Sequence, residues 1–138
     1  MSVMIMRIFI LSLVLMSCKN NIKKTPHSAN ISPGVAHNLI LQQGENQDFH
    51  IVDVRTLPEF NSGHIETAIH IDWQSNREAL SSLNPNHTIL LICQSGRRSA
   101  LAMAHLKKKG FKYLYHLEGG IIAWVKTFNQ FSVSPINE

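Results

Sequence analysis

The sequence predicts an α/β fold in which helices cover both faces of a mostly parallel central sheet. Short β-rich runs alternate with segments whose apolar residues keep helical spacing, and this alternation is typical of a three-layer arrangement. The chain has 138 residues, of which 44% are hydrophobic and 16% are charged. This length and composition allow one compact core and are short for two ordinary domains. We therefore expect one folded domain, over residues 33–138.

The first half of this domain is expected to begin with a helix. Ser32 is typical of an N-cap, Pro33 of the first helical position, and Gly44 of a helix end. A β-rich run at residues 50–54 then predicts a short strand, and a brief turn or helix follows at residues 58–61. These segments supply the first change from helix to strand.

The remaining elements keep the same alternation and are bounded by residues that end helices. Asn84 and Pro85 would stop one helix, and Gly110 would end the next. The expected elements are, in order, a strand at residues 68–71, a helix at 75–83, a strand at 88–92, a helix at 99–109, a strand at 113–117 and a helix at 121–128. In parallel sheets of this kind, reactive groups gather beyond the carboxyl ends of the strands.

The positive charge of the chain is concentrated outside this domain. Thirteen Lys and Arg residues face nine Asp and Glu residues, which gives a formal net charge of +4. Four of the basic residues, Arg7, Lys19, Lys23 and Lys24, lie before residue 35, so the rest of the chain is formally neutral. A nucleic-acid-binding protein would carry its basic residues on the folded domain. We therefore expect no nucleic-acid partner.

The N-terminus is typical of an export signal. Arg7 precedes an apolar run at residues 8–16 that is too short to span a bilayer, and Ser17 and Cys18 follow it. This segment resembles a bacterial lipobox, which implies that residues 1–17 are a signal peptide and that Cys18 is lipidated. An uncleaved anchor or a buried helix is the alternative.

The segment after Cys18 is expected to be a tether. Residues 18–32 are rich in Asn, Lys and Ser and hold few large apolar side chains that could offset the entropy of ordering them. Together with a lipidated Cys18, this predicts an exported domain that is anchored to a bacterial membrane and faces the periplasm. We expect the domain to be a monomer. Met4 and Met6 are alternative starts of the chain.

The loop with the strongest chemical signal begins at Cys93. If Cys18 is lipidated, Cys93 is the only free thiol, since the chain has two cysteines. A free cysteine is most often a small buried apolar residue. Here, however, Cys93 is followed by a loop that leads into a helix N-terminus and holds Gln94, Ser95, Gly96, Arg97, Arg98 and Ser99. Gly96 allows a positive φ, so successive backbone N–H groups can surround the sulfur and stabilise a thiolate, helped by the arginines.

Two families place a cysteine on such a loop, and the loop length separates them. Cysteine phosphatases follow the pattern C-x5-R, but residue 99 is Ser in this chain. The six-residue loop from Cys93 to Arg98 resembles that of single-domain rhodaneses. The other matching segments are Asp53-Val54-Arg55, Glu59-Phe60, Gly63-His64-Ile65 and Leu117-Glu118-Gly119-Gly120 with Trp124. One departure is Thr67, where that family usually has Gly.

The resemblance implies a sulfurtransferase. In that family the cysteine, here Cys93, takes the outer sulfur of a donor such as thiosulfate, holds it as a persulfide and passes it to a thiol or cyanide. Asp53, Arg55 and Glu59 could act as an acid, an anion clamp and a base, but the resemblance implies a scaffold in which Arg55 pairs with carboxylates. His64 follows Gly63 in a turn, so we expect it to bond to backbone and not to act as a base. Neither a metal site nor a cofactor is expected, because the histidines show no metal-ligand spacing.

Two other functions remain open from the sequence. The domain could bind another exported protein with Cys93 idle, or it could be a phosphatase or arsenate reductase of the related fold, which the loop length disfavours. Arg97 and Arg98 leave the loop one residue apart, so we expect one to face the entrance and the other to turn toward the carboxylates of the scaffold.

Overall fold

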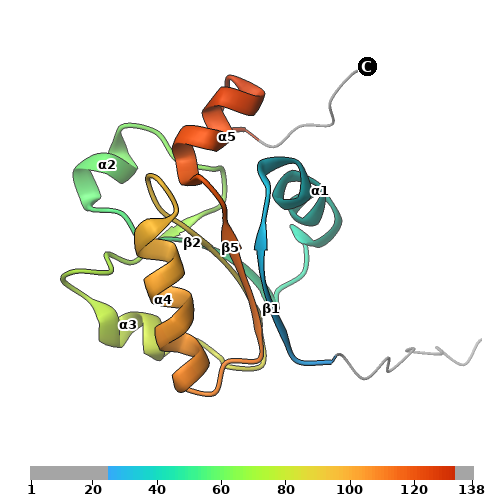
Figure 1. Cartoon of the computed structure of the whole chain (residues 1–138), viewed down its shortest axis with the longest axis vertical. Helices are drawn as coiled ribbons and strands as arrows, with labels where there is room; N and C mark the ends of the chain where they lie inside the picture. The colour runs from blue at the N-terminus through green and yellow to red at the C-terminus, as the bar shows by residue number, and fades with distance from the viewer. Residues whose placement is uncertain (1–24, 133–138) are drawn as a thin grey trace, which may run out of the picture.

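The computed structural model describes residues 25–132, in which five strands and five helices alternate (Figure 1). The strands are β1 (His27–Ile31), β2 (Phe49–Asp53), β3 (Ile69–His70), β4 (Thr88–Ile92) and β5 (Tyr113–Leu117). The helices are α1 (Pro33–Gln43), α2 (Leu57–Asn61), α3 (Arg77–Ser81), α4 (Arg97–Lys108) and α5 (Gly120–Phe128). The predicted signal peptide and Cys18 lie outside the described residues.

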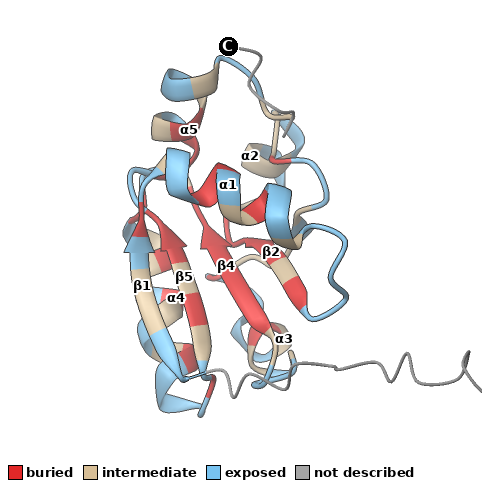
Figure 2. Ribbon diagram, turned by 90° about the vertical axis from the view of Figure 1, so that its right-hand side faces the viewer, coloured by how far each residue is buried: buried red, intermediate tan, exposed pale blue. Residues whose placement is uncertain are grey.

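The strands form one parallel sheet in the order β1-β5-β4-β2-β3. Apolar residues of α1 and α5 pack against one face of the sheet, and those of α3 and α4 pack against the other. β4 lies in the middle of the sheet, and all five of its residues are buried. Figure 2 shows this strand in the colour of buried residues. The α/β class with a parallel central sheet is therefore confirmed, and β4 leads the chain from the core of the sheet to Cys93.

The expected tether at residues 18–32 is wrong where it overlaps β1. His27–Ile31 form an edge strand that pairs with β5 along its whole length, from His27 opposite Tyr113 to Ile31 opposite Leu117. β1 has a mainly polar sequence, and it is held by its pairing with β5, which lies far away along the chain, and by Ile31, which is buried in the core. The folded domain therefore begins before residue 33.

The ends of several elements differ from the sequence prediction. α1 begins as expected, since the Ser32 hydroxyl accepts a hydrogen bond from the Val35 N–H at 3.4 Å. α4 begins two residues earlier than predicted, at Arg97, because Gly96 adopts a φ of 93° and starts the helix directly after the loop. β3 and α3 are shorter than predicted, at two and five residues. The helix start at Arg97 brings the first turn of α4 next to Cys93.

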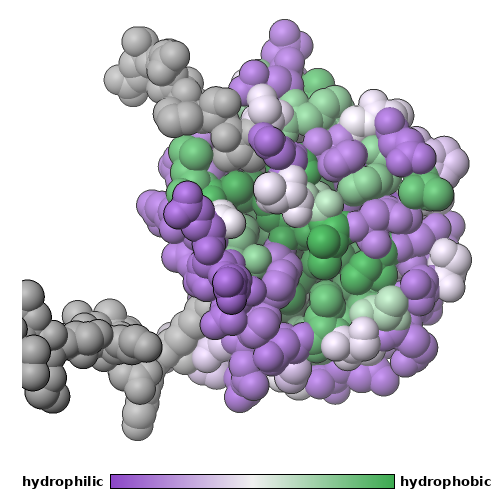
Figure 3. All heavy atoms as spheres, turned by 180° about the vertical axis from the view of Figure 1, so that it is seen from behind, coloured by the Kyte–Doolittle hydropathy of each residue, from purple (hydrophilic) through white to green (hydrophobic). Residues whose placement is uncertain are grey.

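Within residues 25–132 no helix is both long and apolar enough to cross a bilayer. Seen from the side opposite to Figure 1, hydrophobic residues gather near the middle of the surface and hydrophilic residues surround them (Figure 3). Large apolar side chains that are exposed include Ile69 and Leu101.

Replacing Thr67 by Gly should stabilise the fold. The Ala68 N–H donates to the Ile65 carbonyl and closes a turn in which Thr67 has a φ of 67°. A β-branched residue is strained there, whereas Gly is not. After the larger unfolded-state entropy of Gly is subtracted, we expect Thr67→Gly to raise the free energy of unfolding by about 1 kcal/mol in denaturant titrations. Thr67→Ala keeps a Cβ and should gain less, and a loss of stability in Thr67→Gly would contradict this view of the turn.

Candidate active site

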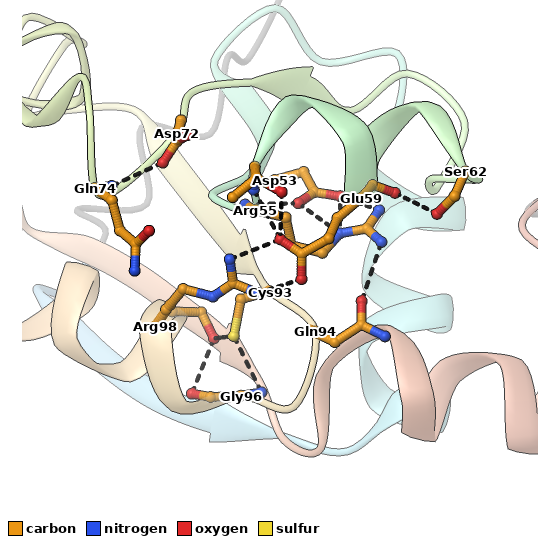
Figure 4. Close-up of polar contacts among 12 residues, drawn as sticks. Asp53, Arg55, Glu59, Ser62, Asp72, Gln74, Cys93, Gln94, Gly96 and Arg98 are labelled. Atoms are coloured by element: carbon orange, nitrogen blue, oxygen red, sulfur yellow. Dashed lines mark hydrogen bonds and ion pairs between the residues drawn. The ribbon is translucent and has the colours of Figure 1, made fainter.

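The Cys93 sulfur lies at the carboxyl end of β4, enclosed by its own loop (Figure 4). The side chain is 1% exposed. Its Sγ accepts a hydrogen bond from the Gly96 N–H at 3.1 Å and lies 3.4 Å from the Ser99 Oγ. The sulfur is thus held by the loop and the first turn of α4, where the helix dipole favours negative charge.

Gly96 makes this turn possible. Its φ of 93° bends the backbone so that its N–H points to the sulfur. A Cβ at this position would lie 3.1 Å from the Gly119 nitrogen and 3.2 Å from the His116 ring. The positive φ predicted for Gly96 is confirmed, and the packing gives a second reason for Gly at this position.

The first turn of α5 holds the start of the loop. The Ile121 N–H donates to the Cys93 carbonyl at 2.9 Å, and the Ile122 N–H donates to the Gln94 carbonyl at 3.1 Å. Gly120 has a φ of 59°, and a Cβ there would lie 2.3 Å from the Cys93 carbonyl oxygen. The Gly119-Gly120 pair is therefore more than a turn, because it allows α5 to approach the loop backbone.

The two arginines of the loop diverge. Arg98 makes two parallel hydrogen bonds with Glu59, of 2.8 and 2.6 Å. These bonds, together with those from the Thr56 backbone and hydroxyl, lower the pKa of Glu59 to about 2, although partial burial opposes the shift. The same pair raises the pKa of Arg98. Arg97 is exposed and makes no ion pair within the described residues. The structure therefore turns Arg98 to the scaffold and leaves Arg97 at the surface.

A buried ion pair ties β2 to the loop. Asp53 and Arg55 are 0% and 1% exposed, and Arg55 Nη2 lies 2.8 Å from Asp53 Oδ2. The same guanidinium donates to the Gly63 carbonyl at 2.7 Å and to Gln94 Oε1 at 3.3 Å. This arrangement fits a scaffold role, because the Arg55 guanidinium is buried and all three of its nitrogens donate to protein groups. His64 lies beside it, where its Nδ1 bonds to the Phe60 carbonyl at 3.0 Å.

A surface hollow of about 470 Å³ opens beside the loop. Its lining consists of Trp73, Gln74, Arg77, Ser95, Arg97, Arg98 and Leu101. The Arg77 guanidinium lies 4.3 Å from the centre of the Trp73 ring and donates from Nε to the Trp73 carbonyl at 3.1 Å. Arg77 was not singled out from the sequence, because only the fold brings α3 next to the loop.

His116 is a second residue that the sequence analysis missed. It lies on β5, is 6% exposed, and has its Nδ1 2.8 Å from the Ser99 Oγ. Burial lowers the pKa of His116, and Glu118 opposes that shift. Its position two residues after the buried Leu114 could have indicated an inward side chain at the carboxyl end of a strand. Within residues 25–132 no three His, Cys, Asp or Glu side chains are grouped so that they could hold a metal.

Residues 35–127 match the family of the Rhodanese-like domain. The chain belongs to this family. It is 35% identical over 79 residues to the putative sulfur carrier protein YrkF of Bacillus subtilis, covering 57% of this chain and 43% of that protein. It is 33% identical over 78 residues to the thiosulfate sulfurtransferase GlpE of Stutzerimonas stutzeri, covering 56% of this chain and 72% of that protein.

Solved structures agree with this assignment. A rhodanese-like domain protein from Staphylococcus aureus has a TM-score of 0.60 and 33% identity, and the match covers 69% of this chain and 89% of that one. The chain spans less than half the length of the first curated relatives that it matches. The family and the names of these relatives support a role in sulfur transfer.

Lowering the pH should remove the contribution of the Glu59–Arg98 pair to stability. The pKa of Glu59 is about 2 in the folded protein against an ordinary 4.5, so the pair stabilises the fold above pH 4.5 and loses this effect as the pH falls toward 2. Water screens the partly exposed pair, so we expect Glu59→Gln to cost about 1 kcal/mol at neutral pH and much less near pH 2.5. Glu45→Gln, at an exposed carboxylate, is the control. Equal losses for Glu59→Gln at both pH values would contradict the assignment.

Proposed function

We propose that Cys93 carries a sulfane sulfur from a small anionic donor such as thiosulfate to a thiol or cyanide acceptor. The observation that carries the proposal is the position of the Cys93 sulfur, enclosed by a six-residue loop and bonded to the Gly96 N–H. A ring of backbone N–H groups in front of a helix N-terminus suits a negatively charged sulfur. The names of the relatives support the same chemistry.

The first half-reaction would load the cysteine. The Cys93 thiolate attacks the outer sulfur of thiosulfate, and a bond forms between Sγ and that sulfur. The bond between the two sulfurs of thiosulfate breaks, and its electron pair leaves with sulfite. The product is a Cys93 persulfide, whose terminal sulfur is negatively charged and is stabilised by the loop N–H groups of residues 94–99.

The second half-reaction would return the cysteine to its starting state. A thiolate or cyanide attacks the terminal sulfur, and the bond to Sγ breaks with its electron pair on Cys93. The acceptor leaves as a persulfide or as thiocyanate. Neither half-reaction needs a metal or a cofactor, and the N–H of Gly96 stabilises the sulfur both as nucleophile and as leaving group.

The structure gives a reason to prefer sulfur transfer over phosphate chemistry. A phosphatase loop needs an Arg that holds the phosphate with two hydrogen bonds, at the position where this chain has Ser99. Arg98, one residue earlier, already makes that kind of double bond with Glu59. The remaining alternative is a binding module in which Cys93 is idle. Sulfur uptake by Cys93 distinguishes it from a sulfurtransferase.

We expect Cys93 to take up one sulfur atom. The purified protein should gain a reductant-labile mass of one sulfur after mixing with thiosulfate, and the adduct should map to the Cys93 peptide by mass spectrometry. Cys93→Ser is the control and should gain nothing. A folded protein whose Cys93 accepts sulfur neither from thiosulfate nor from a small persulfide would favour the binding module.

Arg97 should select anionic donors. It lines the hollow and has no carboxylate partner within residues 25–132, so its charge is available to a ligand. A cation about 5 Å from a thiosulfate oxygen contributes on the order of 1–3 kcal/mol at a protein surface, or roughly five- to hundredfold in transfer efficiency. Arg97→Gln should therefore slow transfer from thiosulfate by this factor, less so at high salt, and should affect a neutral persulfide donor much less.

The matched control for Arg97 is Lys107→Gln, which removes one positive charge at the other end of α4. It should leave both donors unaffected. Equal losses for both donors in Arg97→Gln, independent of salt, would mean that Arg97 only maintains the shape of the loop.

We also propose that the mature protein is held at a bacterial membrane by lipids on Cys18 and faces the periplasm. The support is the sequence alone, in which an apolar run ends at Ser17 and Cys18. Cys18→Ala should move the protein from the membrane to the soluble fraction, because stable attachment needs two acyl chains. If wild type and Cys18→Ala fractionate alike, the anchor at Cys18 is wrong.

A further inference from the structure

The Ser99 hydroxyl lies within hydrogen-bond distance of three possible acceptors. It is 0% exposed and lies 3.4 Å from the Cys93 Sγ, 3.1 Å from the Gly96 carbonyl oxygen and 2.8 Å from the His116 Nδ1. A hydroxyl has one proton, so it can donate to only one of these groups at a time. The group that controls this proton therefore controls one of the hydrogen bonds on the sulfur.

His116 is held so that it can exert this control. It lies on β5 opposite Leu91 of β4, and its ring packs under Gly96, where a Cβ would lie 3.2 Å from the His116 Cε1. The ring is largely buried and reaches Ser99 through Nδ1. β5, α4 and the end of β4 thus hold the His116 ring, the Ser99 hydroxyl and the Cys93 sulfur in one line of contacts.

We propose that His116 is a positioning residue that acts through Ser99: its Nδ1–H donates to the Ser99 oxygen and directs the Ser99 proton onto the Cys93 thiolate. The Gly96 N–H supplies the other hydrogen bond on that sulfur. This inference rests on the proposed function, since it explains how the sulfur is kept ready to attack a donor and to leave after transfer.

The protonation of the ring fits this role. Burial lowers the pKa of His116, so at neutral pH the ring is neutral and carries a single N–H. With that N–H on Nδ1, the ring cannot accept from Ser99, and the Ser99 proton is left to the Gly96 carbonyl or the sulfur. A thiolate is the stronger acceptor because it is charged. A ring that donates to the Ser99 oxygen also makes the hydroxyl a better donor.

Few charged groups surround this line of contacts. Glu118 follows β5 and favours the protonated ring, while β1 places the uncharged Asn30 opposite His116. On the other side of the sulfur, Arg98 of α4 is within electrostatic reach of Cys93 and of Asp53 at the end of β2. The sulfur thus has the charged Arg98 on one side and the uncharged hydrogen-bond donors Ser99 and His116 on the other.

The experiment is a titration of thiolate formation at Cys93 in the full chain. The thiolate absorbs in the ultraviolet, and subtracting the signal of the same protein with Cys93→Ser leaves the contribution of Cys93. Ser99→Ala and His116→Leu should each raise the pH midpoint by about one unit, because a charge-assisted hydrogen bond is lost. The double variant should shift no further than the larger single shift, since both changes break the same line of contacts.

Conservative variants separate positioning from packing. His116→Asn places an N–H near the Nδ1 position and should keep the midpoint close to that of the wild type, whereas His116→Gln places it one carbon farther away and should behave like His116→Leu. His116→Gln also serves if the Leu variant does not fold. The control is His105→Asn, which breaks another Ser–His contact of α4, between His105 Nε2 and Ser81 Oγ at 2.9 Å, and should leave the midpoint unchanged.

Two results would overturn the proposal. If the His116 variants keep the midpoint while Ser99→Ala raises it, His116 serves only packing. If the shifts of the two single variants add, the residues act on the sulfur separately. No sulfur donor is present in this titration, so the positioning role and the proposed sulfur transfer can each fail without the other.

Discussion

Two backbone hydrogen bonds from the first turn of α5 to the Cys93 and Gln94 carbonyls fix the loop on which everything else at the site depends. They are possible only because residue 120 is Gly, since any side chain there would collide with the loop backbone. With these two carbonyls held, the loop directs the Gly96 N–H to the sulfur. The geometry around Cys93 is thus set by helix packing and not by the loop sequence alone.

Two ion pairs lie beside this loop, one buried and one partly exposed. The buried Asp53–Arg55 pair joins β2, the turn at Gly63 and Gln94, and breaking it would leave an unpaired charge in the core. The outer pair, Glu59–Arg98, is partly exposed and joins α2 to the first turn of α4. Because these carboxylates hold Arg55 and Arg98, the positive charge that the hollow leaves for a ligand is on Arg97 and Arg77, which both line it.

The sequence predicted the features that follow from local patterns. Alternating periodicity gave the α/β class, Ser32 the start of α1, and Gly96 the left-handed turn before α4. β1 was missed because its polar residues are ordered by pairing with β5, and local composition carries no sign of such a partner. His116 and Arg77 were missed for the same reason: each reaches the site from an element that only the folded sheet brings there. The divergence of the two loop arginines was expected, but its direction needed the position of Glu59 on α2.

The central claim is that the loop of residues 93–99 is built to hold one extra sulfur atom on Cys93. A high-resolution crystal structure of the protein after exposure to thiosulfate tests it most directly. We expect an additional sulfur bonded to the Cys93 Sγ and surrounded by the loop N–H groups, with the Glu59–Arg98 pair unchanged. An unmodified Cys93, with thiosulfate bound elsewhere or with the loop N–H groups turned away from the sulfur, would contradict the account.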